Sequence, residues 1–432
     1  MDDIEKGKML RYRWVIFAVL LVAYFFVYFH RTSTSVIGPV MIDSIGLPIS
    51  MLALLSSVYF YTYLAMQLPS GFLSDRFGPR RSSAIFLTLA AGGAFLTSVG
   101  DTFAMLAIGK AMIACGMAVV YIPLMKILAV WFRKNEFASL AGVVIAVGNV
   151  GALGAAAPLM MLMETMDWRT VFMLLGVVTL ILAFLCLILI RDHPSQMGFP
   201  SIEEIESEET GIPITESSAA KVPVFQGLKT VFCGGRKFWM PTLAYFVVYG
   251  TIMIYQGLWI KVYFDNTYSF VLSAAWLVTM VAVGKIISSA TLGIFTDRIG
   301  FSKKTVMMIG NIGFLAVWGV IWLHSGSGDY WFWMFINFMF GLFGGFMTLS
   351  FGQVKEWFPL SISGTVVAGM NIFLFGGAAI MQSLSYFMIK DKTLQEFQTL
   401  WMIMFICVIF ACIFTSLSVE KKRESGLEEK GV

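Results

Sequence analysis

Residues 71–81 read GFLSDRFGPRR, and residues 293–304 read GIFTDRIGFSKK. Both stretches contain the pattern G-x-x-x-D-R-x-G followed by two basic residues. A second pair of matches recurs at nearly the same spacing: Tyr24 and Tyr28 correspond to Tyr245 and Tyr249. Parallel repeats of this kind predict two similar halves, with a ligand site at the interface between them near the middle of a membrane.

The composition indicates that the chain is solvated by lipid. Of its 432 residues, 58% are apolar and 13% are charged, and the mean hydropathy is +0.81. Soluble proteins average roughly 25% charged residues, so this chain has too few polar side chains to cover a surface in water. The net charge of +4 is too small to indicate nucleic-acid binding, and the five cysteines have no CxxC spacing that would suggest a metal site.

Twelve apolar runs are each close to the roughly 20 residues that a helix needs to cross a bilayer. They lie at approximately residues 14–38, 51–74, 82–99, 103–131, 138–163, 170–190, 240–262, 272–295, 305–324, 330–355, 364–388 and 397–419. No small-residue cleavage site follows the first run, so we interpret it as a retained span and not as a signal peptide.

The runs divide the chain into four parts. We predict a six-helix half at residues 1–190, a linker at 191–239, a second six-helix half at 240–419 and a tail at 420–432. The linker contains SIEEIESEETGIPITESS, a composition typical of a solvated segment without a core. If the N-terminus is cytoplasmic, the outside loops hold only four basic residues, Arg169, Lys261, Lys390 and Lys392. This asymmetry predicts that both termini and the linker face the cytoplasm.

The repeated loop pattern lies between predicted spans 2 and 3 and again between spans 8 and 9. Its two copies resemble the signature of the major facilitator superfamily of secondary transporters. Three shorter features are similar to the organophosphate:phosphate antiporter and organic anion symporter branches: RYRW at 11–14, Arg31 late in span 1, and RDHPSQMGFPSIEE at 191–204. The resemblance implies an all-α membrane protein with twelve transmembrane helices in two pseudo-symmetric six-helix halves, in a bacterial or archaeal inner membrane.

One position departs from the phosphate-ester antiporters that the sequence resembles. Those proteins use a second arginine, in span 7, to hold the phosphate. Alignment of the tyrosine pairs puts Ile252 near that place, which argues against a phosphate-ester substrate.

Five basic residues fall inside apolar runs, whereas none of the 26 carboxylates lies well inside one. Because a charge inside the membrane is costly, such residues are candidates for a functional site. Several interior cations without fixed anions favour an anionic substrate, which could accept charge-assisted hydrogen bonds, and argue against cation transport. The five residues are Arg31, Lys110, Lys126, Lys285 and Lys355.

We predict that Arg31 and Lys285 contact the anion, with Lys126 as a third candidate. Arg31 shares one face of span 1 with Tyr24 and Tyr28, although it could also extend to the outer surface. Lys285 precedes Asp297 by twelve residues, which places it about 18 Å deep; its alternative role is a structural contact with carbonyls or tyrosines.

Snorkelling to the membrane surface is an alternative for Lys126 and the favoured interpretation for Lys355. Lys110 stands where many superfamily members have an arginine assigned to packing or conformational coupling. His30 could titrate near neutral pH and couple protons, but the cation at Arg31 opposes its protonation.

Polar residues on several spans predict a lined cavity, although each could instead join helices to one another. The candidate substrate contacts among them are Tyr24, Tyr28, Tyr63, Asn149, Tyr249, Gln256 and Asn371. The charged residues of the repeated loops are better interpreted as a gate that latches the cytoplasmic side, as the resemblance also implies. Topology signalling alone would leave the spacing of aspartate and glycine unexplained. The gate candidates are Asp75, Arg76, Arg80, Asp297, Arg298 and Lys303.

These observations predict a monomeric secondary transporter of a small organic anion, either a carboxylate, a sulfonate or a phosphate ester, that works by alternating access. Proton symport and exchange for a counter-anion both fit, and the lack of a buried carboxylate favours exchange or a protonatable substrate. An exporter of amphipathic compounds and a membrane anion sensor are the alternatives. No nucleotide-binding loop, catalytic pattern, metal site or cofactor motif is present in the sequence, so we expect neither an enzyme nor a cofactor.

Overall fold

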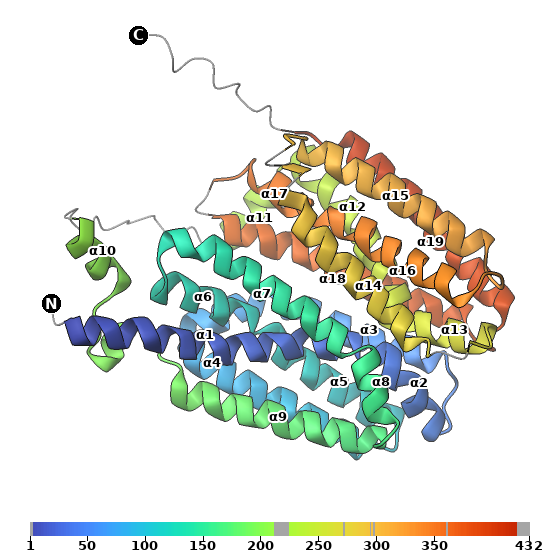
Figure 1. The fold of residues 1–432 in the computed structure, drawn as a ribbon, viewed down its shortest axis with the longest axis horizontal. Helices are drawn as coiled ribbons and strands as arrows, with labels where there is room; N and C mark the ends of the chain where they lie inside the picture. The colour runs from blue at the N-terminus through green and yellow to red at the C-terminus, as the bar shows by residue number, and fades with distance from the viewer. Residues whose placement is uncertain are drawn as a thin grey trace, which may run out of the picture.

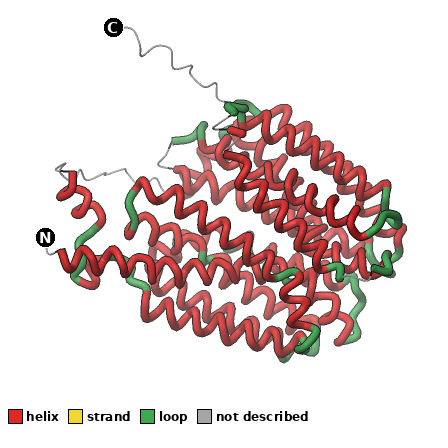
Figure 2. The backbone as a smooth tube through the Cα atoms, in the orientation of Figure 1, coloured by secondary structure: helices red, strands yellow, loops and turns green. Residues whose placement is uncertain are grey.

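The computed structural model describes residues 3–210, 224–270, 273–293, 295–296, 299–359 and 362–420. The backbone within these ranges is mainly helical, without a strand, and short turns connect most of the helices (Figure 2). The long helices lie roughly side by side in a single bundle (Figure 1). This arrangement confirms the predicted all-α fold.

The first half occupies one side of the bundle and the second half the other (Figure 1). The helices of the first half are α1 (Asp3–Thr32), α2 (Thr34–Ser44), α3 (Met51–Ala65), α4 (Gln67–Ser98), α5 (Phe103–Ala118), α6 (Tyr121–Trp131), α7 (Lys134–Gly154), α8 (Ala157–Met163) and α9 (Trp168–Leu189). The linker contributes η1 (Pro194–Met197), α10 (Ile202–Thr210) and α11 (Val224–Phe232). The helices of the second half are α12 (Arg236–Ile254), η2 (Tyr255–Trp259), α13 (Ile260–Thr267), α14 (Ala275–Gly293), α15 (Lys303–Leu323), α16 (Tyr330–Gly345), η4 (Phe346–Thr348), α17 (Leu349–Lys355), α18 (Ser363–Met388) and α19 (Leu394–Leu417).

Ten helices in the described ranges are long and apolar enough to cross a membrane. The other two predicted spans lie in α3 and α4, which meet at a bend of 51°. Helix α4 is itself two helices joined at Gly78, whose φ of 76° and ψ of 163° lie in a region that is essentially restricted to glycine. Residues 79–98 are therefore a helix separate from residues 67–77, and the described residues provide a helical segment for each of the twelve predicted spans.

The two parts of α4 run in opposite directions. Before Gly78, α4 runs parallel to α6. Gly71 lies opposite Ile122, and Asp75, four residues later, lies opposite Lys126, also four residues later. After Gly78, α4 runs antiparallel to α5. Ala90 lies opposite Gly116, and the later residue Thr97 lies opposite the earlier residue Gly109. The small side chains on α5 let the two helices pack closely, as is usual between membrane helices.

Several spans are broken where the sequence analysis expects continuous helices. Proline removes the hydrogen bond to the carbonyl four residues earlier, and its ring clashes with that carbonyl. Three breaks fall at that distance from a proline: Ala65 with Pro69, Val119 with Pro123, and Gly154 with Pro158. Span 1 breaks at Ser33, where the Ser33 and Ser35 hydroxyls donate to the backbone carbonyls of His30 and Thr32.

We call the end of the bundle that carries α10 and α11 the linker end, and the opposite end, with α2, α8 and α13, the far end (Figure 1). The two halves contact each other mainly through α3 with α18 and α7 with α14. Near the far end, the Ala157 N–H donates to Thr279 Oγ1 over 3.2 Å, which joins α8 to α14. The Ser383 hydroxyl donates to Tyr61 Oη over 3.3 Å, which joins α18 to α3.

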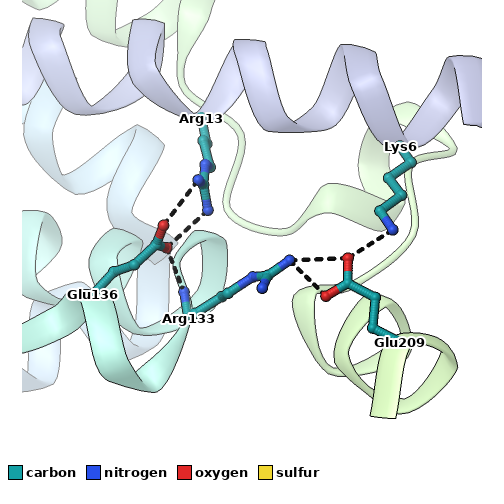
Figure 3. A network of polar contacts seen from close by, with 5 residues as sticks. All are labelled: Lys6, Arg13, Arg133, Glu136 and Glu209. Carbon is teal, nitrogen blue, oxygen red and sulfur yellow. Dashed lines mark hydrogen bonds and ion pairs between the residues drawn. The ribbon is translucent and has the colours of Figure 1, made fainter. Parts of the chain in front are cut away.

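Part of the predicted solvated linker is ordered against the first half. Helix α10 buries Ile202 and Ile205, and Figure 3 shows its Glu209 between two basic side chains. The Glu209 carboxylate pairs with Lys6 at 2.7 Å and with Arg133 at 2.8 Å. The network continues through the N–H of Arg133 to Glu136, which also accepts two hydrogen bonds from Arg13 (Figure 3). The linker is thus attached to α1 and α7.

The hydrogen bond from Lys6, with a further contribution from Arg133, lowers the pKa of Glu209 below its ordinary value. The attachment of α10 therefore persists at neutral pH and is lost as the pH falls through this lowered pKa. We expect Glu209→Gln to speed hydrogen exchange of residues 202–210 at pH 7 by about twofold to fivefold, a modest effect because the pair is exposed. After correction for intrinsic exchange rates, the wild type should approach the variant only in acid. Glu203→Gln is the matched control, and an equal effect there would contradict the assignment.

Candidate functional site

Two connected hollows lie between the halves. The inner hollow is the one lined by Gln256 and Lys285, and it has a volume of about 110 Å³. The outer hollow is the one lined by Gln67 and Lys355, and it has a volume of about 700 Å³. Both are lined by residues of the two halves, and they share Tyr28, Arg31, Asn149 and Tyr245 among others. The outer hollow extends to Leu292 near the linker end of α14. The interface predicted from the repeats therefore contains a cavity.

Arg31 lies in the last turn of α1 and is buried, with 7% of its surface exposed. Its Nη1 donates to Tyr249 Oη of the second half over 3.4 Å. The guanidinium also lies over the rings of Tyr28, Tyr63 and Phe375, at 4.6, 5.0 and 5.1 Å from their centroids. Arg31 thus faces the interface between the halves and does not extend to the outer surface.

Lys285 projects from α14 into the inner hollow. Its Nζ donates to Gln256 Oε1 over 2.6 Å. Gln256 lies in η2, a π-helical segment of span 7, and such segments occur frequently at functional sites. The described partner of Lys285 is therefore a side-chain amide oxygen, and not one of the backbone carbonyls or tyrosines of the structural interpretation.

The charges around the hollows are of one sign. Arg31 and Lys285 come from different halves and line the same inner hollow, and Lys355 lines the outer one. None of the described residues that line either hollow is Asp or Glu. The cavity can therefore offer charge-assisted hydrogen bonds to an anion without a competing fixed carboxylate.

Every predicted substrate contact except Lys126 lines one or both hollows. Tyr249, Gln256 and Lys285 line the inner hollow, and Tyr24, Tyr63 and Asn371 line the outer one. Tyr28, Arg31 and Asn149 line both. The predicted polar residues therefore lie together on the walls of the two hollows.

Lys126 lies apart from the hollows and forms an ion pair with Asp75. A second ion pair at the linker end joins Lys303 to Glu356. These contacts place two gate candidates, Asp75 and Lys303, at the linker end. The first ion pair lies within the first half and the second within the second half. Asp297 and Arg298, the other gate candidates in the second half, lie outside the described residues.

Arg80 and Arg76 differ in how firmly they are held. The Arg80 N–H donates to Asp192 Oδ1 over 2.7 Å, and its Nε donates to the Leu187 carbonyl over 2.7 Å. These bonds tie the loop after span 2 to the end of α9. Arg76 has a weaker contact, with its guanidinium 5.9 Å from the Phe77 ring centroid.

Two further buried basic residues lie within the first half, away from the hollows. Lys110 Nζ donates to Thr34 Oγ1 over 2.9 Å and lies 5.5 Å from the Phe172 ring centroid. His30 is 1% exposed, and its ring nitrogens have no hydrogen-bond partner among the described residues. Lys110 thus contacts residues of its own half, in a position compatible with the packing role that the resemblance implies.

The family of the chain follows from sequence comparison. The profile of the Major Facilitator Superfamily matches residues 20–275 and, in a second match, 243–431. The chain belongs to this superfamily. It is therefore a multi-pass integral membrane transporter and not an enzyme.

Several related members of the superfamily transport small molecules, according to their names. A probable hexose phosphate transport protein of Chlamydia trachomatis is 24% identical, over 87% of this chain and 85% of the relative. A probable sulfoacetate transporter of Cupriavidus necator is 23% identical, over 71% and 72% of the two chains. The hexuronate transporter of Escherichia coli is 22% identical, over 69% and 70%.

Solved structures of the superfamily have the same fold. A bacterial homologue of the human lysosomal transporter Spinster, in an inward-facing and unoccupied conformation, matches with a TM-score of 0.70 and 14% identity. That match covers 94% of this chain and 97% of the other. The nucleoside transporter NupG matches with a TM-score of 0.69 and 12% identity, over 94% and 98% of the two chains.

Some lining residues of this transporter were missed by the sequence analysis. Ser289 and Thr348 line both hollows. Ser289 follows Lys285 by four residues, so its place on the same helix face is a signal in the sequence. Thr348 belongs to the short segment η4, where the helical period changes, and the sequence offers no comparable signal for it.

Gly78 is needed for two reasons: its backbone conformation is restricted to glycine, and a Cβ atom there would lie 2.5 Å from Asp192 Oδ2. We expect Gly78→Ala to destabilise the protein by about 2 kcal/mol or more. Gly198→Ala is the matched control, because Gly198 has φ 71° but open space around it, and should cost about 1 kcal/mol. Thermal unfolding in detergent measures both. Equal melting temperatures in the two variants would contradict a special role for Gly78.

Proposed function

We propose that the chain transports a small organic anion by alternating access, with Arg31 and Lys285 as the contacts of the anionic group. The observation that carries the proposal is the pair of cations, one from each half, on an inner hollow whose described lining contains no carboxylate. Two desolvated cations held by neutral partners leave their charge available to a ligand. Arginine adds a planar fork that suits bidentate contact with an oxyanion.

The size of the hollows supports a small anionic head on a compact body. About 110 Å³ in the inner hollow suits a carboxylate, sulfonate or phosphate group, while the outer hollow of about 700 Å³ has room for a sugar or similar body. The relatives named for hexose phosphate, sulfoacetate and hexuronate would all carry substrates with such a group.

Lys285 supplies the second cation from a different span than the phosphate-ester antiporters use. Ile252, at the place of their second arginine, lines the inner hollow as an apolar residue. Lys285 reaches the same hollow from α14 and is held by Gln256. An ammonium is a point charge without the planar fork of arginine, so the absence of the second arginine, and not the presence of the lysine, argues against a phosphate ester.

Exchange for a second anion is the proposed coupling. A proton symporter needs a group that changes its charge in the cavity, and the described lining offers no Asp or Glu for that role. A substrate that carries its own proton is the alternative. The outer hollow reaches the linker end, whereas the halves are joined near the far end, which supports access from the linker side in this conformation.

The topology and location belong to the same proposal. The distribution of Lys and Arg supports a cytoplasmic linker end with both termini on that side. The bacterial sources of the related transporters support a bacterial inner membrane. We propose that a monomer is the transporting unit, because the two halves of one chain together line both hollows.

A thermal-shift and binding panel tests the proposal with glucuronate, sulfoacetate, glucose 6-phosphate, uncharged glucose and the tetraphenylphosphonium cation. We expect one anion to stabilise the purified protein by mass action. Arg31→Gln and Lys285→Gln should each weaken its binding at least tenfold, because a hydrogen bond to a charged group contributes about 1.5–3 kcal/mol. Gln256→Glu should weaken it similarly by placing a carboxylate beside Lys285.

Lys126→Gln is the control, because Lys126 pairs with Asp75 outside the hollows. Unchanged binding in this variant would assign Lys126 to the gate, and a loss would return it to the substrate site. Stabilisation only by glucose or by tetraphenylphosphonium, unaffected by the substitutions, would reject the anion proposal in favour of an exporter. Uptake into anion-free proteoliposomes driven by a pH gradient then separates exchange from proton symport, because an exchanger needs an anion inside the vesicle and a proton symporter does not.

A further inference from the structure

Lys355 is the last residue of α17 and lines the outer hollow near the linker end. Its side chain has no hydrogen-bond or ion-pair partner in the part of the chain that the structure describes. The adjacent carboxylate, Glu356, pairs instead with Lys303. The sequence predicts only a membrane-surface anchor here, whereas the structure shows a cation on the wall of the cavity.

Two other lysines at this end form ion pairs with carboxylates. Lys126 pairs with Asp75, and Lys303 pairs with Glu356. The cluster of Lys303, Lys355 and Glu356 therefore keeps one net positive charge, and that charge belongs to the side chain that faces the hollow. Low-dielectric walls around a cavity concentrate such a field and raise the local concentration of a counter-ion.

The position of Lys355 along the helix separates it from the inner cations. Thr348 lines both hollows and so marks the level at which they join. Lys355 follows it by seven residues, which corresponds to about 10 Å along the helix axis. The anionic group held by Arg31 and Lys285 therefore lies at another level of the cavity than Lys355, so contact of that group with Lys355 is a separate step.

We propose that Lys355 forms an outer binding position for a carboxylate, sulfonate or phosphate group, where the anion is held between the linker-end solution and the inner cations. This inference rests on the proposed anion transport. Its amine donates charge-assisted hydrogen bonds to the anionic group. Gln67 and Asn371, which line the same hollow from opposite halves, supply further polar contacts.

The outer position serves one side of the membrane. Near the far end, Lys261 pairs with Asp265, and Arg169 pairs with Asp101 at 2.6 Å. These ion pairs neutralise two of the four basic residues predicted for that end, and the other two, Lys390 and Lys392, line neither hollow. Loss of Lys355 should therefore slow capture of the anion from the linker side while leaving the inner site intact.

The test uses charged thiol reagents and so does not depend on the substrate. Ala290 is exposed and lines the outer hollow, so Ala290→Cys is a small reporter. Its modification by anionic sulfonatoethyl methanethiosulfonate and by cationic trimethylammonioethyl methanethiosulfonate is followed by mass spectrometry of the peptide that contains residue 290. We expect Lys355→Gln to lower the ratio of the anionic to the cationic rate about threefold or more, and Lys355→Arg to preserve it.

Lys229→Gln is the matched control, since it removes an exposed lysine of α11 that lies outside the lining of the outer hollow. An unchanged ratio in Lys355→Gln, or an equal fall in Lys229→Gln, would overturn the proposal. Sulfate should slow the anionic reagent more than chloride of equal ionic strength in the parent and not in Lys355→Gln. Equal effects of the two salts would mean a diffuse field without a binding position, which also overturns it. If no anion in the binding panel stabilises the protein, the proposed anion transport is rejected, but the expected thiol-modification rates at residue 290 stay the same.

Discussion

The interior of this transporter is organised around two cations that lack a carboxylate partner in the described structure. Arg31 lies over aromatic rings and donates to Tyr249, and Lys285 donates to Gln256. Burial of unpaired charge in a membrane is costly, so these neutral groups must be held in place by the helices that carry them. The close packing of the two halves and the π-helical segment in span 7 provide that support while leaving the charge uncompensated.

The sequence predicts the fold well because membrane spans have a simple requirement for length and hydropathy. The long apolar helices confirm the predicted all-α membrane fold, and the family profile confirms the predicted superfamily. The breaks inside the spans were not predicted, although Pro69, Pro123 and Pro158 marked three of them. The break at Ser33 depends on hydroxyl groups that bond to the backbone, and the same residues are equally common in unbroken helices.

The site is harder to predict from the sequence than the fold, because contacts between helices depend on how the helices rotate and pack. Periodicity and the repeat brought Arg31, Tyr28 and Gln256 to the cavity correctly. They could not show that Lys126 pairs with Asp75 in the loop between spans, or that Lys355 turns towards the hollow. A lysine near the end of a span can extend in either direction, and only the neighbouring helices decide which.

The ion pairs of helix α10 also bear on the order of biosynthesis. Glu209 contacts Lys6 and Arg133 (Figure 3), so all three partners leave the ribosome before the second half is made. Domains generally fold as units during synthesis, with the N-terminal one first. The first half can therefore bind the linker helix α10 while the remaining spans are still being inserted. In this way the linker helix completes the first half before it connects it to the second.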